Sequence, residues 1–146
     1  MNILEMKQEE CLELLSSERI GRLGCSKDGQ SYIVPISYSL DENYLYSFSL
    51  DGQKIEWMRT NSAVCVQVDR LVAHDDWTSV IVCGRYEELP DQIGGKHIRE
   101  RAWSLLSRHA NWWEPGAVKP MTHSPAPHLF YRIRIESMTG RRAIQK

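Results

Sequence analysis

Residues 32–40 have the sequence Tyr-Ile-Val-Pro-Ile-Ser-Tyr-Ser-Leu, and this stretch decides the fold. Its large side chains recur at every second position, which predicts a β-strand with one buried face. Pro35 has no backbone N–H and therefore removes one donor from the strand's hydrogen-bond ladder. We expect this strand to have an unpaired side or to lie at an edge of its sheet.

Similar patterns continue on both sides of this stretch. Alternating or β-branched runs predict strands at Arg19–Cys25, Tyr32–Leu40, Tyr44–Ser49, Ala63–Asp69, Trp77–Leu89 and Phe130–Glu136. Apolar residues at helical spacing predict helices at Lys7–Ser17, Gln53–Asn61 and Asp91–Ala110. The expected turns and loops are Lys27–Gln30, with its Asp-Gly hairpin signal, the proline-rich Asn111–Pro127, and Thr139–Arg141. Short strands with few, separate helices indicate an antiparallel barrel with appended helices.

Length and composition fit a soluble protein of one domain. The 146 residues include 18 basic and 19 acidic side chains, for a net charge of −1. A nearly neutral chain lacks the positive surface that non-specific nucleic-acid binding needs. No segment approaches the ~18 apolar residues of a membrane span, and the first ten residues lack the apolar run of a signal peptide. Four widely spaced cysteines without a C-x-x-C pair favour reduced thiols in a cytoplasmic protein.

The segment from Ser49 to Lys54 predicts an anion-binding site. Here a strand runs through Gly52 into a helix with a lysine in its first turn. A helix start offers free N–H groups and a positive dipole end, and the ammonium adds a full charge, so a phosphate would bind here. We expect Gly52 to allow a close backbone approach or a positive φ. Ser47 and Ser49 would add hydroxyl groups, although a lysine that simply faces water remains an alternative.

Three other features are candidate ligand contacts. The backbone around Pro35 could meet a planar heterocycle, or the proline could protect an edge strand. Ser79 could donate to a phosphate or pack between strands. Trp112 and Trp113 could cover a flat ligand, pack on a partner subunit or fold over the barrel's own core. The five histidines lack metal-ligand spacing, and no Ser/His/Asp, paired-carboxylate or phosphate-loop pattern supports a hydrolase.

In their order and spacing these motifs resemble the pyridoxamine 5′-phosphate oxidase-like family of FMN-binding split barrels, and within it the nitroimidazole-resistance branch. The similarity runs from about Arg19 to Arg142. It depends on the strand around Pro35, the Gly52–Lys54 turn, Ser79–Val80 with Gly84, Pro115–Gly116 and Thr139–Arg141. The resemblance implies a mainly β fold, a six-stranded antiparallel split β-barrel in a single domain over residues 1–146. It also implies a homodimer with shared FMN sites at the subunit interface.

The resemblance also implies roles for individual residues. The isoalloxazine ring would be lined by Pro35, Ile36 and Ser37. The ribityl phosphate would be held by Ser47, Phe48, Ser49 and Lys54, with Ser79 nearby, and the partner subunit would contribute Trp112 or Trp113. Some nitroimidazole-resistance relatives have a histidine where this sequence has Ser47, which argues against antibiotic reduction. The basic pattern of true pyridoxamine phosphate oxidases is absent, which argues against pyridoxal phosphate synthesis.

The sequence thus predicts an FMN-dependent reductase of small electron-poor molecules, such as nitroaromatics or quinones. In such a protein the flavin carries the chemistry and no catalytic side chain is required. A non-catalytic flavin or haem carrier, or a redox sensor with the same barrel, is the alternative. A third hypothesis is a ligand-free dimerisation module. The sequence also does not decide between FMN, F420 and haem as the bound cofactor.

Overall fold

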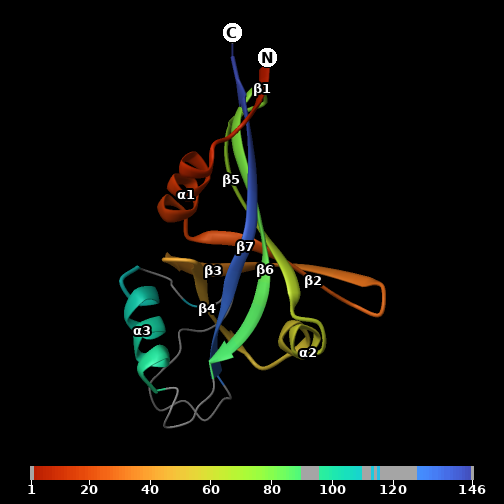
Figure 1. The fold of residues 1–146 in the computed structure, drawn as a ribbon, viewed down its shortest axis with the longest axis vertical. Helices are drawn as coiled ribbons and strands as arrows, with labels where there is room; N and C mark the ends of the chain where they lie inside the picture. Colours follow the sequence, from red (N-terminus) through yellow and green to blue (C-terminus); the bar gives the residue numbers. More distant parts are fainter. Residues whose placement is uncertain (1, 90–95, 110–112, 114, 116–127, 146) are drawn as a thin grey trace.

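The computed structural model describes residues 2–89, 96–109, 113, 115 and 128–145. Its strands are β1 (Asn2–Glu5), β2 (Ile20–Lys27), β3 (Gln30–Asp41), β4 (Tyr44–Leu50), β5 (Ala63–Ala73), β6 (Asp76–Leu89) and β7 (His128–Ile144). Its helices are α1 (Gln8–Ser17), α2 (Gln53–Thr60) and α3 (Lys96–Leu106). Figure 1 shows the long strand β7 running the length of the molecule, with the three helices at separate places around the sheet.

The strands form one antiparallel sheet that closes on itself. Its order is β1-β7-β4-β3-β2-β5-β6, and β6 pairs with β7 as well, so that β2 to β7 make a ring. Strand β7 pairs with β6 along most of its length, and its other side pairs first with β4 and then with β1. The predicted six-stranded antiparallel barrel is confirmed. Strand β1, which the sequence pattern did not predict, adds a short strand outside the ring.

The barrel is split between β3 and β4. These strands pair from Tyr38 to Asp41 of β3, and among the described residues the first part of β3 pairs with β2 alone. Strand β4 pairs with β7 along its whole length, and beyond Ser47 it has no further register partner on β3 among the described residues. Pro35 lies in the first part of β3, opposite Arg22 of β2, and its other side faces the split. The expectation of an unpaired side at the proline is confirmed.

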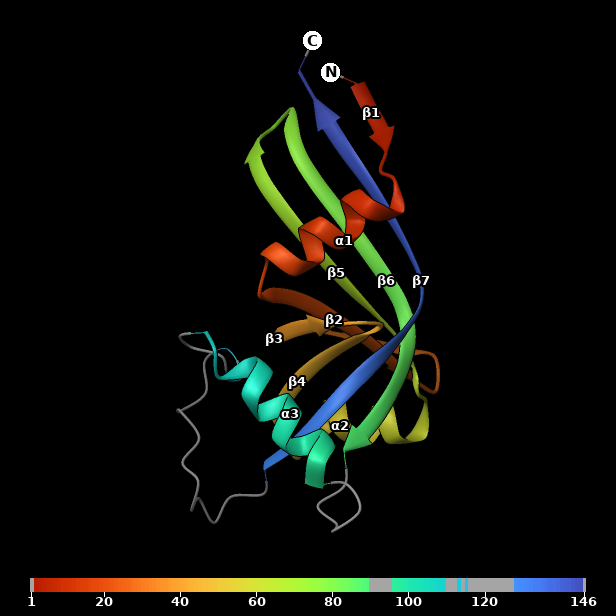
Figure 2. The ribbon, with the colours of Figure 1, turned by 60° about the vertical axis from the view of Figure 1, so that its left-hand side comes forward.

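Apolar side chains fill the barrel, and α1 and α2 cover its ends. The core unites inward-facing residues of all six ring strands with residues of both helices: Cys11, Leu14, Leu15, Leu23, Cys25, Ile36, Tyr38, Leu45, Ile55, Met58, Val64, Val66, Val68, Val80, Val82, Tyr86, Tyr131, Ile133 and Ile135. The Tyr38 hydroxyl donates a 2.7 Å hydrogen bond to the Leu15 carbonyl, which joins α1 to β3. Figure 2 shows α1 crossing β5, β6 and β7.

Helix α3 lies on the outer face of β4 and β7 (Figure 2). Its buried residues Ala102, Leu105 and Leu106 pack against aromatic side chains of these strands. The helix ends at Leu106, short of the predicted end at Ala110, and Ile98 near its start is exposed. In the described part of the chain, no helix has the length and hydropathy to cross a membrane.

Gly140 marks a packing site instead of the turn predicted at Thr139–Arg141. Strand β7 continues without a break to Ile144. A Cβ at Gly140 would lie 2.7 Å from Cys11 Sγ and 2.9 Å from Met6 Sδ. The glycine therefore lets the first segment of the chain and α1 pack directly on β7, and the turn prediction was wrong.

Candidate functional site

Most of the predicted site residues border the split between β3 and β4. Pro35, Ile36 and Ser37 lie on β3, and Ser47, Phe48 and Ser49 lie on β4. Pro35 is exposed, whereas the other five are buried. Strand alternation turns Ile36, Ser47 and Ser49 toward the interior and Pro35, Ser37 and Phe48 toward the outside. The split thus combines an exposed strand edge with two buried serine hydroxyl groups.

Two hydroxyl groups join both sides of the split to residue 113. Ser47 Oγ donates a 2.6 Å hydrogen bond to the Ser37 carbonyl, and Ser37 Oγ donates a 2.8 Å hydrogen bond to the Trp113 carbonyl. The Trp113 side chain packs with Phe48 and Leu106. Within one chain Trp113 therefore lies over its own barrel, beside the split. Trp112 lies outside the described residues, as does most of the predicted proline-rich loop.

Lys54 lies in the first turn of α2 and is only 7% exposed. Helix α2 packs across β2, and the Trp57 ring meets the Tyr32 ring of β3 edge-on at 5.9 Å. Burial raises the pKa of the Cys25 thiol, and the nearby Lys54 charge lowers it. The ammonium therefore lies within electrostatic reach of the inner face of β2. The sequence left open that Lys54 simply faces bulk water, and its burial shows that this alternative is wrong.

Gly52 precedes α2 in an extended conformation. Its φ of −170° is one that any residue adopts, so the expectation of a positive φ was wrong. A Cβ at Gly52 would meet nothing within 4 Å. The space beside the start of the helix is therefore open. A ligand could approach the backbone closely at Gly52, as the sequence predicts.

A charged network fixes α2 at both ends. Arg59, in its last turn, donates from Nε to Glu88 Oε1 at 2.7 Å and from Nη2 to Glu88 Oε2 at 3.2 Å. Arg59 Nη1 also lies 3.3 Å from Asp51 Oδ1, just before the helix. The Tyr86 hydroxyl donates to Glu88 Oε1 at 2.7 Å. Sequence patterns do not identify these residues, because Glu88 is 29 positions from Arg59 and no local pattern relates them.

Glu88→Gln is expected to lower the free energy of unfolding by about 1 kcal/mol at neutral pH, the upper end for a partly exposed ion pair. The Arg59 hydrogen bonds, opposed by burial and assisted by the Tyr86 hydroxyl, hold the pKa of Glu88 below its usual value. A carboxylate with a lowered folded-state pKa stabilises the fold above its unfolded pKa of about 4.3, and this contribution is lost as the pH falls through the folded-state value. Urea unfolding of both proteins from neutral pH to about pH 3 measures the effect.

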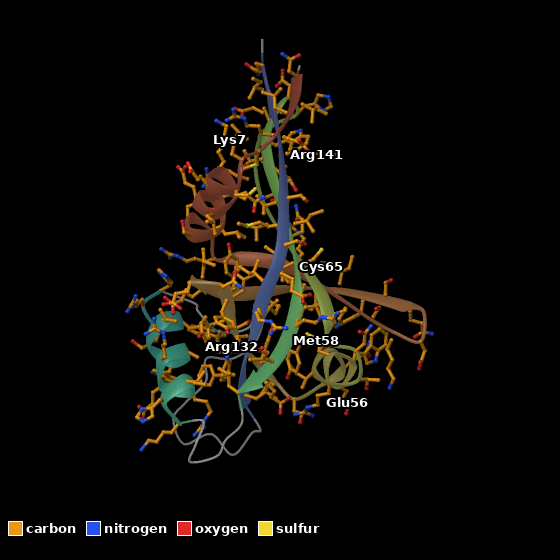
Figure 3. All side chains as sticks on the ribbon, in the orientation of Figure 1. Lys7, Glu56, Met58, Cys65, Arg132 and Arg141 are labelled. Carbon is orange, nitrogen blue, oxygen red and sulfur yellow. The ribbon has the colours of Figure 1, made fainter. Side chains whose placement is uncertain are left out.

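Glu56→Gln is the matched control, because Glu56 is exposed on α2, the helix that carries Arg59, and its substitution removes the same charge (Figure 3). The difference between wild type and Glu88→Gln should shrink toward acidic pH. A difference that stays constant down to about pH 3 would contradict the role assigned to this carboxylate.

The structure does not bring Ser79 to the split within one chain. Ser79 lies on β6, where its Oγ accepts a 3.0 Å hydrogen bond from Gln67 Nε2. On β7, Ser79 pairs with Arg141 whereas Ser47 pairs with Tyr131, so ten positions along this strand, about 33 Å, separate them. Gln67 belongs to an outer polar row with Arg22 and Asp69, which are 3.0 Å apart. Arg22 faces Pro35 across β2 and β3, so it is an additional candidate at the edge of the site.

The arrangement offers an anion site beside a flat strand edge. Lys54 and the open start of α2 suit a phosphate, and the exposed side of β3 at Pro35 suits a planar ring. Among the described residues no cluster of three or more His, Cys, Asp or Glu side chains could hold a metal ion. The chemistry of these residues therefore suits a phosphate group and a planar ring.

Comparison with known proteins identifies the family. The sequence profile of a family described as pyridoxamine 5′-phosphate oxidase matches residues 7–142. An uncharacterised protein of Rhizobium meliloti is 44% identical over 146 residues, which cover 98% of this chain and 97% of the relative.

Two solved structures share the fold. An FAD-binding protein from Mesorhizobium loti is 51% identical, with a TM-score of 0.83 and coverage of 99% of this chain and 100% of the other. A 5-nitroimidazole antibiotic resistance protein from Bacteroides thetaiotaomicron, described as putative, has a TM-score of 0.70 over 99% of this chain and 93% of the other. At 20% identity, the second shows the fold alone.

Proposed function

We propose that this chain, which belongs to the pyridoxamine 5′-phosphate oxidase family, binds a flavin nucleotide in the split between β3 and β4. The observation that carries the proposal is the burial of Lys54 in the first turn of α2. The Lys54 charge adds to the positive end of the helix dipole at this helix start. A ribityl phosphate would bind there because both the dipole and the ammonium favour negative charge.

FMN is the form of the cofactor that we expect, and FAD is its closest competitor. Both contain the ribityl phosphate that Lys54 would hold, and the Mesorhizobium relative is named as an FAD-binding protein. The ring would lie along Pro35, Ile36 and Ser37, on the unpaired side of β3. Ser47, Phe48 and Ser49 of β4 would hold the ribityl phosphate together with Lys54, and Trp113 would cover the ring. A bound flavin supplies hydride or electron transfer, while the chain's own residues bind and orient it.

We further infer that the protein is a flavin-dependent reductase of small electron-poor molecules of the nitroaromatic or quinone type. The exposed edge at Pro35 supports this inference, because an acceptor needs access to one face of the ring. The competing function is a flavin or haem carrier, or a redox sensor. A carrier would need the same pocket, but one face of its flavin ring need not be open to a second molecule. Access of an electron acceptor to the bound flavin therefore distinguishes the two functions.

The active form is proposed to be a cytoplasmic homodimer in which the partner completes each flavin site. Ile33 supports this assembly, because it is 71% exposed on the same face of β3 as Pro35, beside the split. All four cysteines are free, which suits a reducing compartment. Light scattering should give twice the chain mass of 16.9 kDa, and a stable monomer that binds flavin fully would contradict the shared site.

Spectroscopy and titration test the cofactor directly. The purified protein should show the visible absorption bands of a flavin, and the stripped protein should bind FMN or FAD more tightly than riboflavin, which lacks the phosphate. Failure to bind any of the three would refute flavin binding. Oxidation of NADH or NADPH with a quinone as acceptor then tests catalysis. Bound flavin without turnover would favour the carrier.

A further inference from the structure

Cys65 of β5 and Cys83 of β6 are neighbours across two paired strands. They are register partners in the β5–β6 ladder. Both side chains point to the outside of the barrel, because the adjacent residues Val64, Val66 and Val82 are buried in the core. Both cysteines are free, and Cys83 is exposed. The two thiols therefore share one outer face.

The hydrogen-bond pattern gives this pair a backbone spacing that suits a disulfide. The Tyr86 N–H donates a 2.9 Å hydrogen bond to the Ser62 carbonyl, in the same register as the cysteine pair. Hydrogen-bonded and non-hydrogen-bonded pairs alternate along an antiparallel ladder. Three positions from Ser62, the cysteines form a non-hydrogen-bonded pair, whose Cα atoms are about 4.5 Å apart. That spacing lies within the range of about 4.4 to 6.8 Å found for disulfides.

The Cys65 thiol lies in the space left by the missing side chain of Gly24. Gly24 is the partner of Cys65 on β2, and a Cβ there would lie 2.9 Å from Cys65 Sγ. Figure 3 labels Cys65 in this part of the barrel, near the crossing of β6 and β2. Burial and the neighbouring Cys83 raise the pKa of the Cys65 thiol, and a hydrogen bond with the Gly24 backbone lowers it. Both thiols line one surface groove of about 460 Å³ together with Ile33.

We propose that Cys65 and Cys83 form a reversible disulfide within one chain when the protein meets a low-molecular-weight disulfide. The exposed Cys83 thiolate attacks one sulfur of that molecule, which forms a mixed disulfide and releases one small thiol. The Cys65 side chain then turns from Gly24 toward Cys83, and its thiolate attacks the Cys83 sulfur and releases the second small thiol. The two protein thiols are oxidised, and the small disulfide is reduced to two thiols. The step is independent of the proposed flavin.

Mass spectrometry of the full-length protein after incubation with glutathione disulfide tests this assignment. Digestion without reductant should give a cross-linked pair of peptides containing Cys65 and Cys83, and dithiothreitol should release it. The intact chain should lose the mass of two hydrogen atoms without keeping glutathione. Cys83→Ser should abolish the cross-link, and Cys65→Ser should leave a lasting glutathione adduct on Cys83. Cys11→Ser should leave the cross-link intact.

Three results would overturn the proposal. The first is a lasting glutathione adduct on Cys83 in the wild type, which would mean that Cys65 cannot reach the mixed disulfide. The second is a Cys83–Cys83 link between two chains, and the third is the absence of any oxidation at either thiol. Serine is nearly isosteric with cysteine, and thermal unfolding of each variant verifies that it is folded before its chemistry is compared.

Discussion

Lys54→Ala is expected to weaken FMN binding at least tenfold while leaving riboflavin binding nearly unchanged. A charge-assisted hydrogen bond to phosphate contributes about 1.5–3 kcal/mol, and each 1.4 kcal/mol corresponds to a factor of about ten in affinity. Because riboflavin has no phosphate, its affinity reports ring contacts alone. Fluorescence titration of the stripped protein with both molecules gives the two dissociation constants directly.

Two variants separate the role of this ammonium from general effects of charge and packing. Lys96→Ala removes a lysine whose side chain is 66% exposed, and it should leave both affinities unchanged. Lys54→Arg keeps the charge and should recover part of the FMN affinity. Equal losses for FMN and riboflavin would mean that the substitution disturbs the barrel instead. No loss for either would refute the role proposed for Lys54, whereas a wild type that binds neither molecule would favour a barrel that serves as a ligand-free dimerisation module.

Gly84→Ala is expected to cost about 3 kcal/mol of stability, the upper part of the range for overpacking. A Cβ at Gly84 would lie 2.2 Å from the Arg134 carbonyl oxygen and 2.9 Å from Ile133 Cγ2. The Arg134 carbonyl oxygen is a backbone atom, so it cannot move aside as a flexible side chain would. The β6–β7 pairing is also irregular here, with a register shift between Cys83 and Gly84. The melting temperature should fall by roughly 10 °C.

Gly52→Ala is the matched control for this substitution. Its Cβ would have open space within 4 Å, and its extended φ of −170° suits alanine. Stability should change by less than about 0.5 kcal/mol. If Gly84→Ala were as stable as Gly52→Ala, the close contact between β6 and β7 at this position would be refuted.

Sequence patterns predicted the ring strands well because each has one buried face and therefore a clear alternation. Strand β1 was not predicted because it has no buried face and therefore no alternating pattern. Residues Asn2–Glu5 are all exposed, and the strand forms through pairing with the end of β7. The end of β7 was missed because Gly140 resembles a turn glycine in sequence, whereas its real neighbours are Met6 and Cys11, far away in the chain.

The site could be predicted in part. Lys54 and the residues around Pro35 lie on contiguous motifs; the structure buries Lys54 and leaves one side of β3 at Pro35 unpaired among the described strands. The hydroxyl chain from Ser47 through Ser37 to Trp113 spans separations of 10 and 76 residues, so it depends on strand register that no local pattern contains. The same is true of the Arg59 network around α2.

Strand β7 has a consequence for the order of folding. It is the last strand of the chain, yet it supplies the partner that both β4 and β6 need to close the ring. During synthesis these two strands would emerge with bare edges, which are prone to pair with other chains. Late, long-range closure of this kind also slows folding. Truncation before residue 128 should therefore yield an aggregating chain, and a chaperone that shields strand edges should improve the recovery of the full-length protein.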